Sequence, residues 1–290
     1  MKIPPLYKYR YFNENMVSKV GSPNGAQIPQ WQHVLYGGFI TLASPETFND
    51  PYDCDFVVES SFLHEKAARE LYIDTLLQLK IPLTEQDKNM LRATDNWKDA
   101  LAQFMIEPPS PSFVDNLIQG VNDAFKKLKK EFMVACFSAV NDSILMWSHY
   151  AQNHTGFCIE YDFEKSPLAK HLHPVQYSKQ RKHISGVFAN FDGNLANKAI
   201  YEATLYKSAE WKYEKEWRSV FYRETINPLS FGKVGFQLKN YIRSVYLGAK
   251  AEEKYCTKIC EHYRGTDVKV YQMRMQADSY KLKPELIEVT

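Results

Sequence analysis

An acidic pair near residue 215 offers the clearest chemistry in this sequence. Glu214 and Glu216 lie two residues apart in the run EWKYEKEWRSVFY, and in an extended segment they project from one face together with Arg218. Two such carboxylates can hold a ribose hydroxyl and stabilise developing positive charge. They can also divide acid and base roles, because repulsion between them separates their pKa values. A solvated strand face with alternating charge explains the same spacing equally well.

An arginine and a serine at other strand-like runs are further candidates. The run LYKYRYF predicts a strand in which Arg10 shares a face with Leu6 and Lys8. The planar guanidinium of Arg10 suits a phosphate or a carboxylate, although a surface ion pair on an edge strand is the more common role. Ser138 ends the apolar run FMVACFS, where its hydroxyl can orient a ligand or satisfy a turn amide. No GxSxG motif surrounds this serine, so serine-hydrolase chemistry is not expected.

Aromatic residues follow one face of the helix predicted over SILMWSHYAQ. Asn141 or Asp142 is expected to cap this helix. Helical spacing places four residues on one stripe: Ser143, Trp147, Tyr150 and His154. Such a stripe can stack a planar ring, but core packing is the more common use of it. His149 lies off the stripe and points elsewhere.

The run FNDPYD places polar side chains beside a proline. Asn49, Asp50 and Asp53 there are typical of local turns, and the rim of a pocket is the alternative. Asp50 and Asp53 with His149 and Glu216 would also make a metal-dependent nuclease conceivable. However, the sequence has no HExxH motif and no close DxD pair, so no metal site is predicted. It also lacks a GxGxxG motif and a P-loop, which argues against Rossmann and P-loop nucleotide binding.

The elements that must position these residues are strands and helices in an α+β arrangement. Strands are predicted at residues 5–12, 39–43, 55–59 and 132–138, and at the runs GFCIEYDF, HPVQYS, EWRSVFY, SVYLG, VKVYQMRM and SYKLK. Helices are predicted at residues 31–36, 62–79, 85–105, 113–130, 143–152, 185–206 and 251–263. We therefore expect a single domain over residues 1–290 with mixed, mostly antiparallel sheets and a helical insertion over about residues 60–131.

Composition narrows the class of protein further. The 36 Lys and Arg against 34 Asp and Glu leave a net charge of +2, less positive than is usual for a DNA-binding domain. The five cysteines have irregular spacing, which favours reduced thiols in a reducing compartment. The chain begins without the apolar core of a signal peptide and has no apolar stretch of about 20 residues. We therefore expect a cytoplasmic protein that does not enter a membrane.

This chain resembles an uncharacterised bacterial family, a domain of unknown function, in which several of the sequence runs described above occur together. The runs are LYKYR, FNDPYD, CFS, LMWSHYAQNHTGFCIEYD and WKYEKEWR, and their order extends from Leu6 to about Lys283. A more distant similarity is to ADP-ribosyltransferases of the Arg-Ser-Glu type. Arg10, Ser138 and the Glu214–Glu216 pair follow the order of that motif, although CFS followed by alanine departs from the usual Ser-Thr-Ser.

The transferase resemblance implies roles for the motif residues, with NAD as the substrate. Arg10 would bind the pyrophosphate or the nicotinamide-side ribose, and Ser138 would brace the glutamate. Glu216 would accept a hydrogen bond from the ribose 2′-hydroxyl and stabilise an oxocarbenium-like transition state as nicotinamide leaves. Glu214 would orient the acceptor of ADP-ribose.

Other residues complete the predicted NAD site. Trp147 or Tyr150 would stack the nicotinamide, while His149, Asn49 and Asp50 would line the same cofactor-binding site. The acceptor would be a protein, a nucleic acid or water, and a role as a bacterial toxin or antiviral defence effector follows by analogy. The alternatives are a non-catalytic module that binds a nucleotide or a partner, and the metal-dependent nuclease. The sequence leaves the oligomeric state open.

Overall fold

The computed structural model divides the chain into two compact units. It describes residues 2–15, 17–18, 28–58, 80–94, 129–184, 193–225 and 235–287, with isolated positions within 70–78 and 119–127. Unit 1 comprises residues 1–44, 133–177 and 209–290, and unit 2 comprises residues 45–132 and 178–208. The segment expected to be a helical insertion, about residues 60–131, therefore belongs to unit 2 together with a second stretch of chain.

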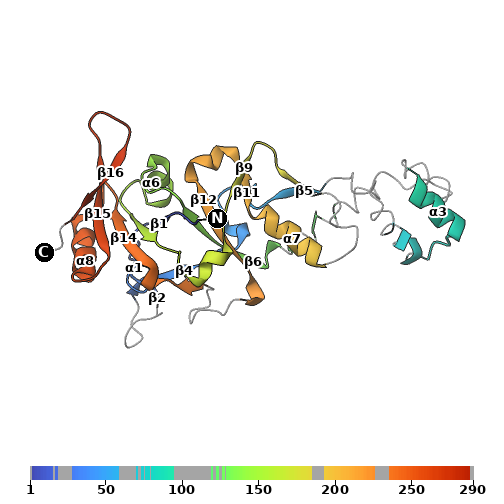
Figure 1. The fold of residues 1–290 in the computed structure, drawn as a ribbon, viewed down its shortest axis with the longest axis horizontal. Coiled ribbons are helices and arrows are strands. Elements are labelled where there is room, and N and C mark those ends of the chain that lie inside the picture. Colours follow the sequence, from blue (N-terminus) through green and yellow to red (C-terminus); the bar gives the residue numbers. More distant parts are fainter. Residues whose placement is uncertain are drawn as a thin grey trace. The chain divides into compact units, whose positions relative to one another are not determined.

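Unit 1 is built on one mixed sheet of eight strands in the order β16-β15-β14-β7-β1-β6-β12-β8 (Figure 1). The strands are β1 (Leu6–Arg10), β6 (Phe132–Ser138), β7 (Phe157–Tyr161), β8 (Leu172–Pro174), β12 (Glu216–Tyr222), β14 (Ile242–Leu247), β15 (Lys269–Met275) and β16 (Leu282–Leu286). β14 and β15 pair in parallel and are connected through helix α8 (Glu253–Tyr263), as parallel neighbours require. β1 pairs antiparallel with both β6 and β7. The expected α+β class with a mostly antiparallel sheet is confirmed.

Helices cover both faces of this sheet, and the alternation of side chains along β1 shows how. Leu6 belongs to the larger apolar core, with residues of α1 (Gln30–Leu35) and α8. Tyr9 belongs to a second core, where its ring meets Trp147 of α6 (Ile144–Tyr150) edge to face at 5.2 Å. Figure 1 shows α6 on one side of the sheet and α1 and α8 on the other. We call these sides the α6 face and the α8 face.

Shorter elements complete the two units. In unit 1, β4 (Phe39–Thr41) pairs with β13 (Gly235–Gln237), and β2 (Val17–Ser18) pairs with β3 (Ile28–Pro29). In unit 2, β5 (Phe56–Val58) pairs in parallel with β10 (Lys182–Ile184). The remaining elements are α3 (Glu85–Ala93), α7 (Gly193–Ala203), β9 (Gln176–Ser178) and β11 (Tyr206–Ser208). A capping box between Thr84 and Asp87 begins α3.

Several sequence-based boundaries need correction. The helix over SILMWSHYAQ is capped by Ser143 rather than Asn141 or Asp142, because the Ser143 hydroxyl accepts from the Met146 amide. The helix expected over residues 185–206 is described as α7, and the chain then enters a strand. Of the helix expected over 85–105, α3 is the described part. The helices expected over 62–79 and 113–130 lie largely outside the described residues.

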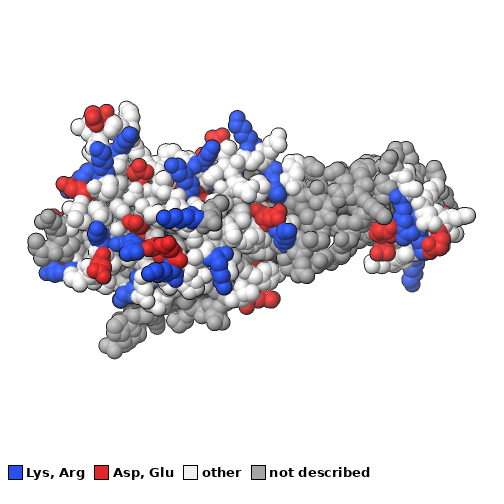
Figure 2. All heavy atoms as spheres, in the orientation of Figure 1, with Lys and Arg blue, Asp and Glu red and all other residues white. Residues whose placement is uncertain are grey.

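The surface and the helices of the described part bear on two broader expectations. Figure 2 shows lysines and arginines interspersed with aspartates and glutamates on the visible face. In the part of the chain that the structure describes, no helix combines the length and the apolar character needed to cross a bilayer.

Candidate functional site

The two acidic residues singled out by the sequence lie on either side of the junction between a turn and a strand, rather than in one strand. Glu214 ends a 3₁₀ turn over Ala209–Glu214, and β12 begins at Glu216. Between them Lys215 has a φ of 45°, in the left-handed region that non-glycine residues rarely adopt. The prediction that Glu214 projects from an extended segment alongside Glu216 and Arg218 is therefore wrong, because the left-handed backbone at Lys215 separates the turn from the strand.

Ser138, at the end of β6, holds this turn in place. Its hydroxyl donates to the Glu214 carbonyl at 2.7 Å and is itself 3.1 Å from the Val140 amide, which donates to it. One residue on, the Ala139 amide donates to the Lys215 carbonyl at 3.0 Å. The serine thus acts on the backbone of the acidic turn, and residues 76 positions apart in the chain are joined at one end of the sheet.

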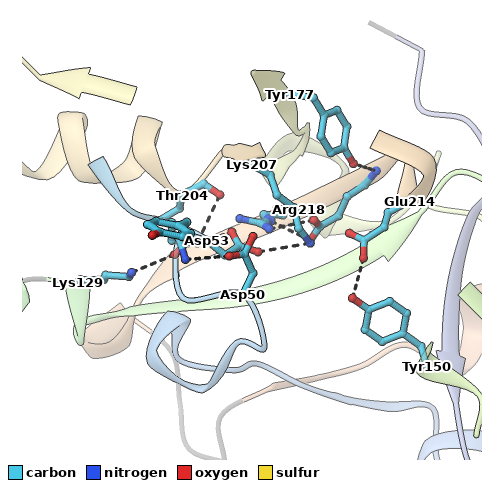
Figure 3. A network of polar contacts seen from close by, with 12 residues as sticks. Asp50, Asp53, Lys129, Tyr150, Tyr177, Thr204, Lys207, Glu214 and Arg218 are labelled. Atoms are coloured by element: carbon cyan, nitrogen blue, oxygen red, sulfur yellow. Dashed lines mark hydrogen bonds and ion pairs between the residues drawn. The ribbon is translucent and has the colours of Figure 1, made fainter. Parts of the chain in front are cut away.

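The carboxylate of Glu214 is buried and bound by a tyrosine. Only 3% of this residue is exposed, and its Oε1 accepts a 2.6 Å hydrogen bond from the Tyr150 hydroxyl at the end of α6 (Figure 3). The His149 ring lies 6.5 Å from the Trp211 ring and 6.4 Å from the Tyr213 ring. The His149 ring also lies 6.3 Å from the Tyr150 ring, so the tyrosine that binds Glu214 belongs to a group of aromatic rings, and the buried carboxylate is in a medium poorer in water than bulk solvent.

Glu216 has a different environment, because it forms a buried ion pair. Arg218 is fully buried and donates from Nε to Glu216 Oε1 at 2.8 Å and from Nη2 to Oε2 at 2.9 Å. The Glu216 amide donates to the Tyr177 hydroxyl at 2.8 Å. The pKa of the nearby Cys136 thiol is raised well above its usual value, chiefly by burial and to a lesser degree by the Glu216 carboxylate. Both oxygens of Glu216 are thus engaged by one guanidinium.

Arg10 does not join this group, because it lies on the α8 face of the sheet. It alternates with Tyr9, whose ring packs on the α6 face, and shares its own side with Leu6. Trp217 belongs to the same core as Leu6, so Glu216 next to it points to the α6 face. The sequence predicted one site for Arg10, Ser138 and the acidic pair, and the structure brings together only the serine and the carboxylates.

The aromatic stripe of α6 is divided between packing and the site. Trp147 is fully buried and donates from Nε1 to the Asn141 carbonyl at 2.7 Å, so it is a core residue. Tyr150 is partly exposed and reaches Glu214. His154 lies beyond the end of the helix, where its Nε2 is 3.2 Å from the Ser148 hydroxyl. His149, expected to point away from the stripe, is exposed near Trp211.

The candidates of the FNDPYD run belong to unit 2 and make local contacts there. Asp50 Oδ1 accepts from the Tyr52 amide at 2.8 Å, the Asx turn that the proline-flanked sequence favours, and Asn49 is exposed. Asp53 is 2% exposed, and its Oδ2 lies 3.4 Å from the Lys207 ammonium (Figure 3). Among the described residues, no three His, Cys, Asp or Glu side chains are grouped so as to hold a metal ion.

Sequence reasoning missed three aromatic residues of this site: Tyr177, Trp211 and Tyr213. A signal was present, since AEWKYE places a tryptophan and a tyrosine directly before the acidic pair. The alternation of an extended run hides this signal, because it places Trp211 and Tyr213 on the face opposite Glu214 and Glu216. In the 3₁₀ turn the Trp211 and Tyr213 rings come within 6.0 Å of each other.

The fold and site define an α+β protein with a buried carboxylate among aromatic rings. A DUF2971 domain, described as a protein of unknown function, matches residues 146–219. This segment contains Tyr150 and the acidic turn with Arg218, but neither Arg10 nor Ser138. No curated protein and no solved structure matches the chain.

Proposed function

We propose that unit 1 is an ADP-ribosyltransferase-like enzyme that cleaves the nicotinamide–ribose bond of NAD, with Glu214 as the carboxylate that stabilises the reacting ribose. The observation that carries the proposal is that the Glu214 carboxylate is buried and accepts a hydrogen bond from the Tyr150 hydroxyl. The backbone carbonyl of the same residue accepts a hydrogen bond from the Ser138 hydroxyl. This second hydrogen bond supports a role for Ser138 in positioning the acidic turn. Arg10 lies on the other face of the sheet and has no part in this ligand site.

The proposed reaction needs a negative charge close to the ribose carbon. As the C1′–N bond breaks, its electron pair leaves with nicotinamide and positive charge develops on the ribose. A carboxylate held in a fixed position stabilises that charge more than it stabilises the ground state. The acceptor, a protein side chain, a nucleic acid or water, then forms the new bond to C1′ and loses a proton.

The division of labour within the acidic pair is specific. Glu214 accepts a hydrogen bond from the neutral Tyr150 hydroxyl, whereas both oxygens of Glu216 accept from the Arg218 guanidinium. A carboxylate that is already paired with a guanidinium stabilises a positively charged transition state less, because the guanidinium neutralises its charge. We therefore assign the chemical role to Glu214, and assign to Glu216 and Arg218 the positioning of the strand that follows the turn.

The test is nicotinamide release from NAD by the purified chain. Wild type is expected to release nicotinamide, and Glu214→Gln is expected to lower kcat by at least about a hundredfold, as removal of one preorganised electrostatic group commonly does. Glu210→Gln is the matched control, because Glu210 lies in the same 3₁₀ turn but is exposed. Far-ultraviolet circular dichroism checks that each variant is folded.

Two results would remove the proposal. One is a wild type that releases no nicotinamide with water, protein extract or nucleic acid as the acceptor. The other is a folded Glu214→Gln variant as active as wild type.

A non-catalytic nucleotide-binding module is the second candidate. The buried Glu216–Arg218 ion pair favours it, because a carboxylate bound by a guanidinium is less able to stabilise positive charge on a reacting ribose. Calorimetry that detects NAD binding by wild type, weakened in Tyr150→Phe, without any nicotinamide release would support this module over the enzyme.

A further inference from the structure

We propose that the α8 face of the unit 1 sheet carries an oxyanion-binding site, in which Arg10, Lys8 and Tyr161 donate to a phosphate or carboxylate group. The site is separate from the acidic turn, since these residues project from the opposite face of the sheet. It therefore does not depend on the proposed enzymatic function.

The first observation is a guanidinium that has no acceptor among the residues that the structure describes. Arg10 is partly buried in β1, at the middle of the eight-stranded sheet. Its side chain makes no hydrogen bond or ion pair with any residue that the structure describes. Desolvation, the largest cause, lowers its pKa, and the ionisable groups that oppose this shift are Tyr161, Cys136 and Tyr11, none of them a carboxylate. Partial desolvation of a guanidinium without a bound anion is unfavourable in free energy. A ligand that supplies an anion at this position would reduce that cost.

The second observation is a cation two residues away on the same face. The Lys8 ammonium donates to the Cys136 carbonyl at 2.5 Å and lies 5.4 Å from the centre of the Phe137 ring. An ammonium has three donors, so this one carbonyl leaves capacity for an anion. Burial and repulsion from Arg10 lower the pKa of Lys8 to about 7, and Glu216 and Cys136 are the nearby groups that raise it.

The third observation is a buried hydroxyl without a partner. Tyr161 is fully buried in β7, and its hydroxyl has no hydrogen-bond partner in the described structure. Its ring lies 6.0 Å from the Phe137 ring, the same ring that Lys8 covers. Burying a hydroxyl without a partner is unfavourable. An oxyanion held by Lys8 and Arg10 would give this hydroxyl the acceptor it lacks.

The chemistry of the donors indicates the class of ligand. A guanidinium offers two parallel N–H donors, an ammonium offers a point charge and a phenol offers one O–H, a set that suits a phosphate or a carboxylate. Arg10 keeps some exposure, so an anion can reach it from solvent. Phosphate and acetate are the two probes that separate these groups.

Thermal unfolding of the full chain in phosphate, in acetate and in chloride at equal ionic strength tests the site. Wild type is expected to show a saturable rise in Tm with phosphate or acetate over chloride. Arg10→Met is expected to weaken the apparent affinity at least tenfold, as loss of a charge-assisted pair does. Arg243→Met is the control, because Arg243 is an exposed arginine of β14 paired with Asp162. Glu214→Gln is expected to keep the full rise.

Tyr161→Phe tests the geometry without removing a charge. The variant is expected to be at least as stable as wild type in chloride, because it removes a buried hydroxyl that has no partner. It is also expected to bind the anion several-fold more weakly. A purely structural role for Tyr161 predicts no change in anion affinity.

Proton uptake gives a further readout that does not require the Arg10 variant to fold. An anion beside Lys8 raises the pKa of that ammonium from about 7, so calorimetry in two buffers at pH 8 is expected to show protons taken up on binding. The proposal is overturned if wild type shows no anion-specific rise in Tm, or if a folded Arg10→Met responds to the anions as wild type does. Anion binding without proton uptake at pH 8 would remove Lys8 from the site.

Discussion

At the scale of single residues, the acidic pair of this chain divides into two different carboxylates. Glu214 is bound by the Tyr150 hydroxyl, and Glu216 is bound twice by Arg218. Spacing two residues apart suggested a matched pair on one face. The difference arises because one residue ends a turn and the next acidic residue begins a strand.

The buried pair yields a prediction about stability. Glu216→Gln or Arg218→Met alone is expected to lower the free energy of unfolding by about 3–5 kcal/mol, because each breaks a buried, doubly hydrogen-bonded ion pair. The double variant is expected to lose much less than the sum of the two, and a urea-unfolding double-mutant cycle measures the coupling. Additive losses would mean that the two side chains do not depend on each other.

At the scale of elements, the short stretches that connect strands position the site. The turn over Ala209–Glu214 and the end of β6 are joined by the Ser138 hydroxyl and the Ala139 amide. Strand periodicity predicted the core strands of the sheet, since apolar residues on both faces of β6 and β7 leave little ambiguity. Strand periodicity did not predict the turn over Ala209–Glu214, because the alternation of charged and aromatic residues in this run is also typical of a strand.

The left-handed residue in that turn can be tested by substitution. Lys215 has a φ of 45°, so Lys215→Val is expected to destabilise the protein by about 1–2 kcal/mol, since a β-branched side chain is strained there. Lys215→Gly is expected to be close to neutral, because relief of strain offsets the greater freedom of the unfolded chain. Thermal unfolding of the two variants makes the comparison, and equal losses would argue against a strained turn.

At the scale of the whole molecule, unit 1 is assembled from three separate stretches of chain. Its central strands β1, β6 and β12 come from all three stretches, which is why distant residues such as Ser138 and Glu214 meet. Unit 2 collects residues 45–132 with residues 178–208 and contains the buried Asp53–Lys207 pair.

The pH dependence of global stability follows from Lys8. Its pKa in the folded protein is about 7, below the ordinary 10.5 that applies when the chain is unfolded. Between these values the unfolded chain binds more protons, so Lys8 makes the free energy of unfolding rise with pH, by up to about 1.4 kcal/mol per pH unit. Lys8→Met is expected to remove this contribution.

Urea unfolding of both proteins from pH 7 to pH 9.5 in chloride measures the difference. The range stops there because ionisation of tyrosines has the opposite sign: Tyr7 and Tyr36 have pKa values raised to about 12, chiefly by burial, so stability falls above pH 10. Parallel pH profiles for wild type and Lys8→Met would contradict the assignment.

Local patterns of residues were sufficient to predict the α+β class and the strands of the unit 1 sheet. Those features depend on periodicity and on residue chemistry within a few positions of the chain. Which face Arg10 occupies relative to Glu216, which arginine binds that glutamate and which tyrosine binds Glu214 depended on strand register and on a turn at Lys215. These are contacts between distant stretches, and a shift of one residue in a strand moves a side chain to the opposite face.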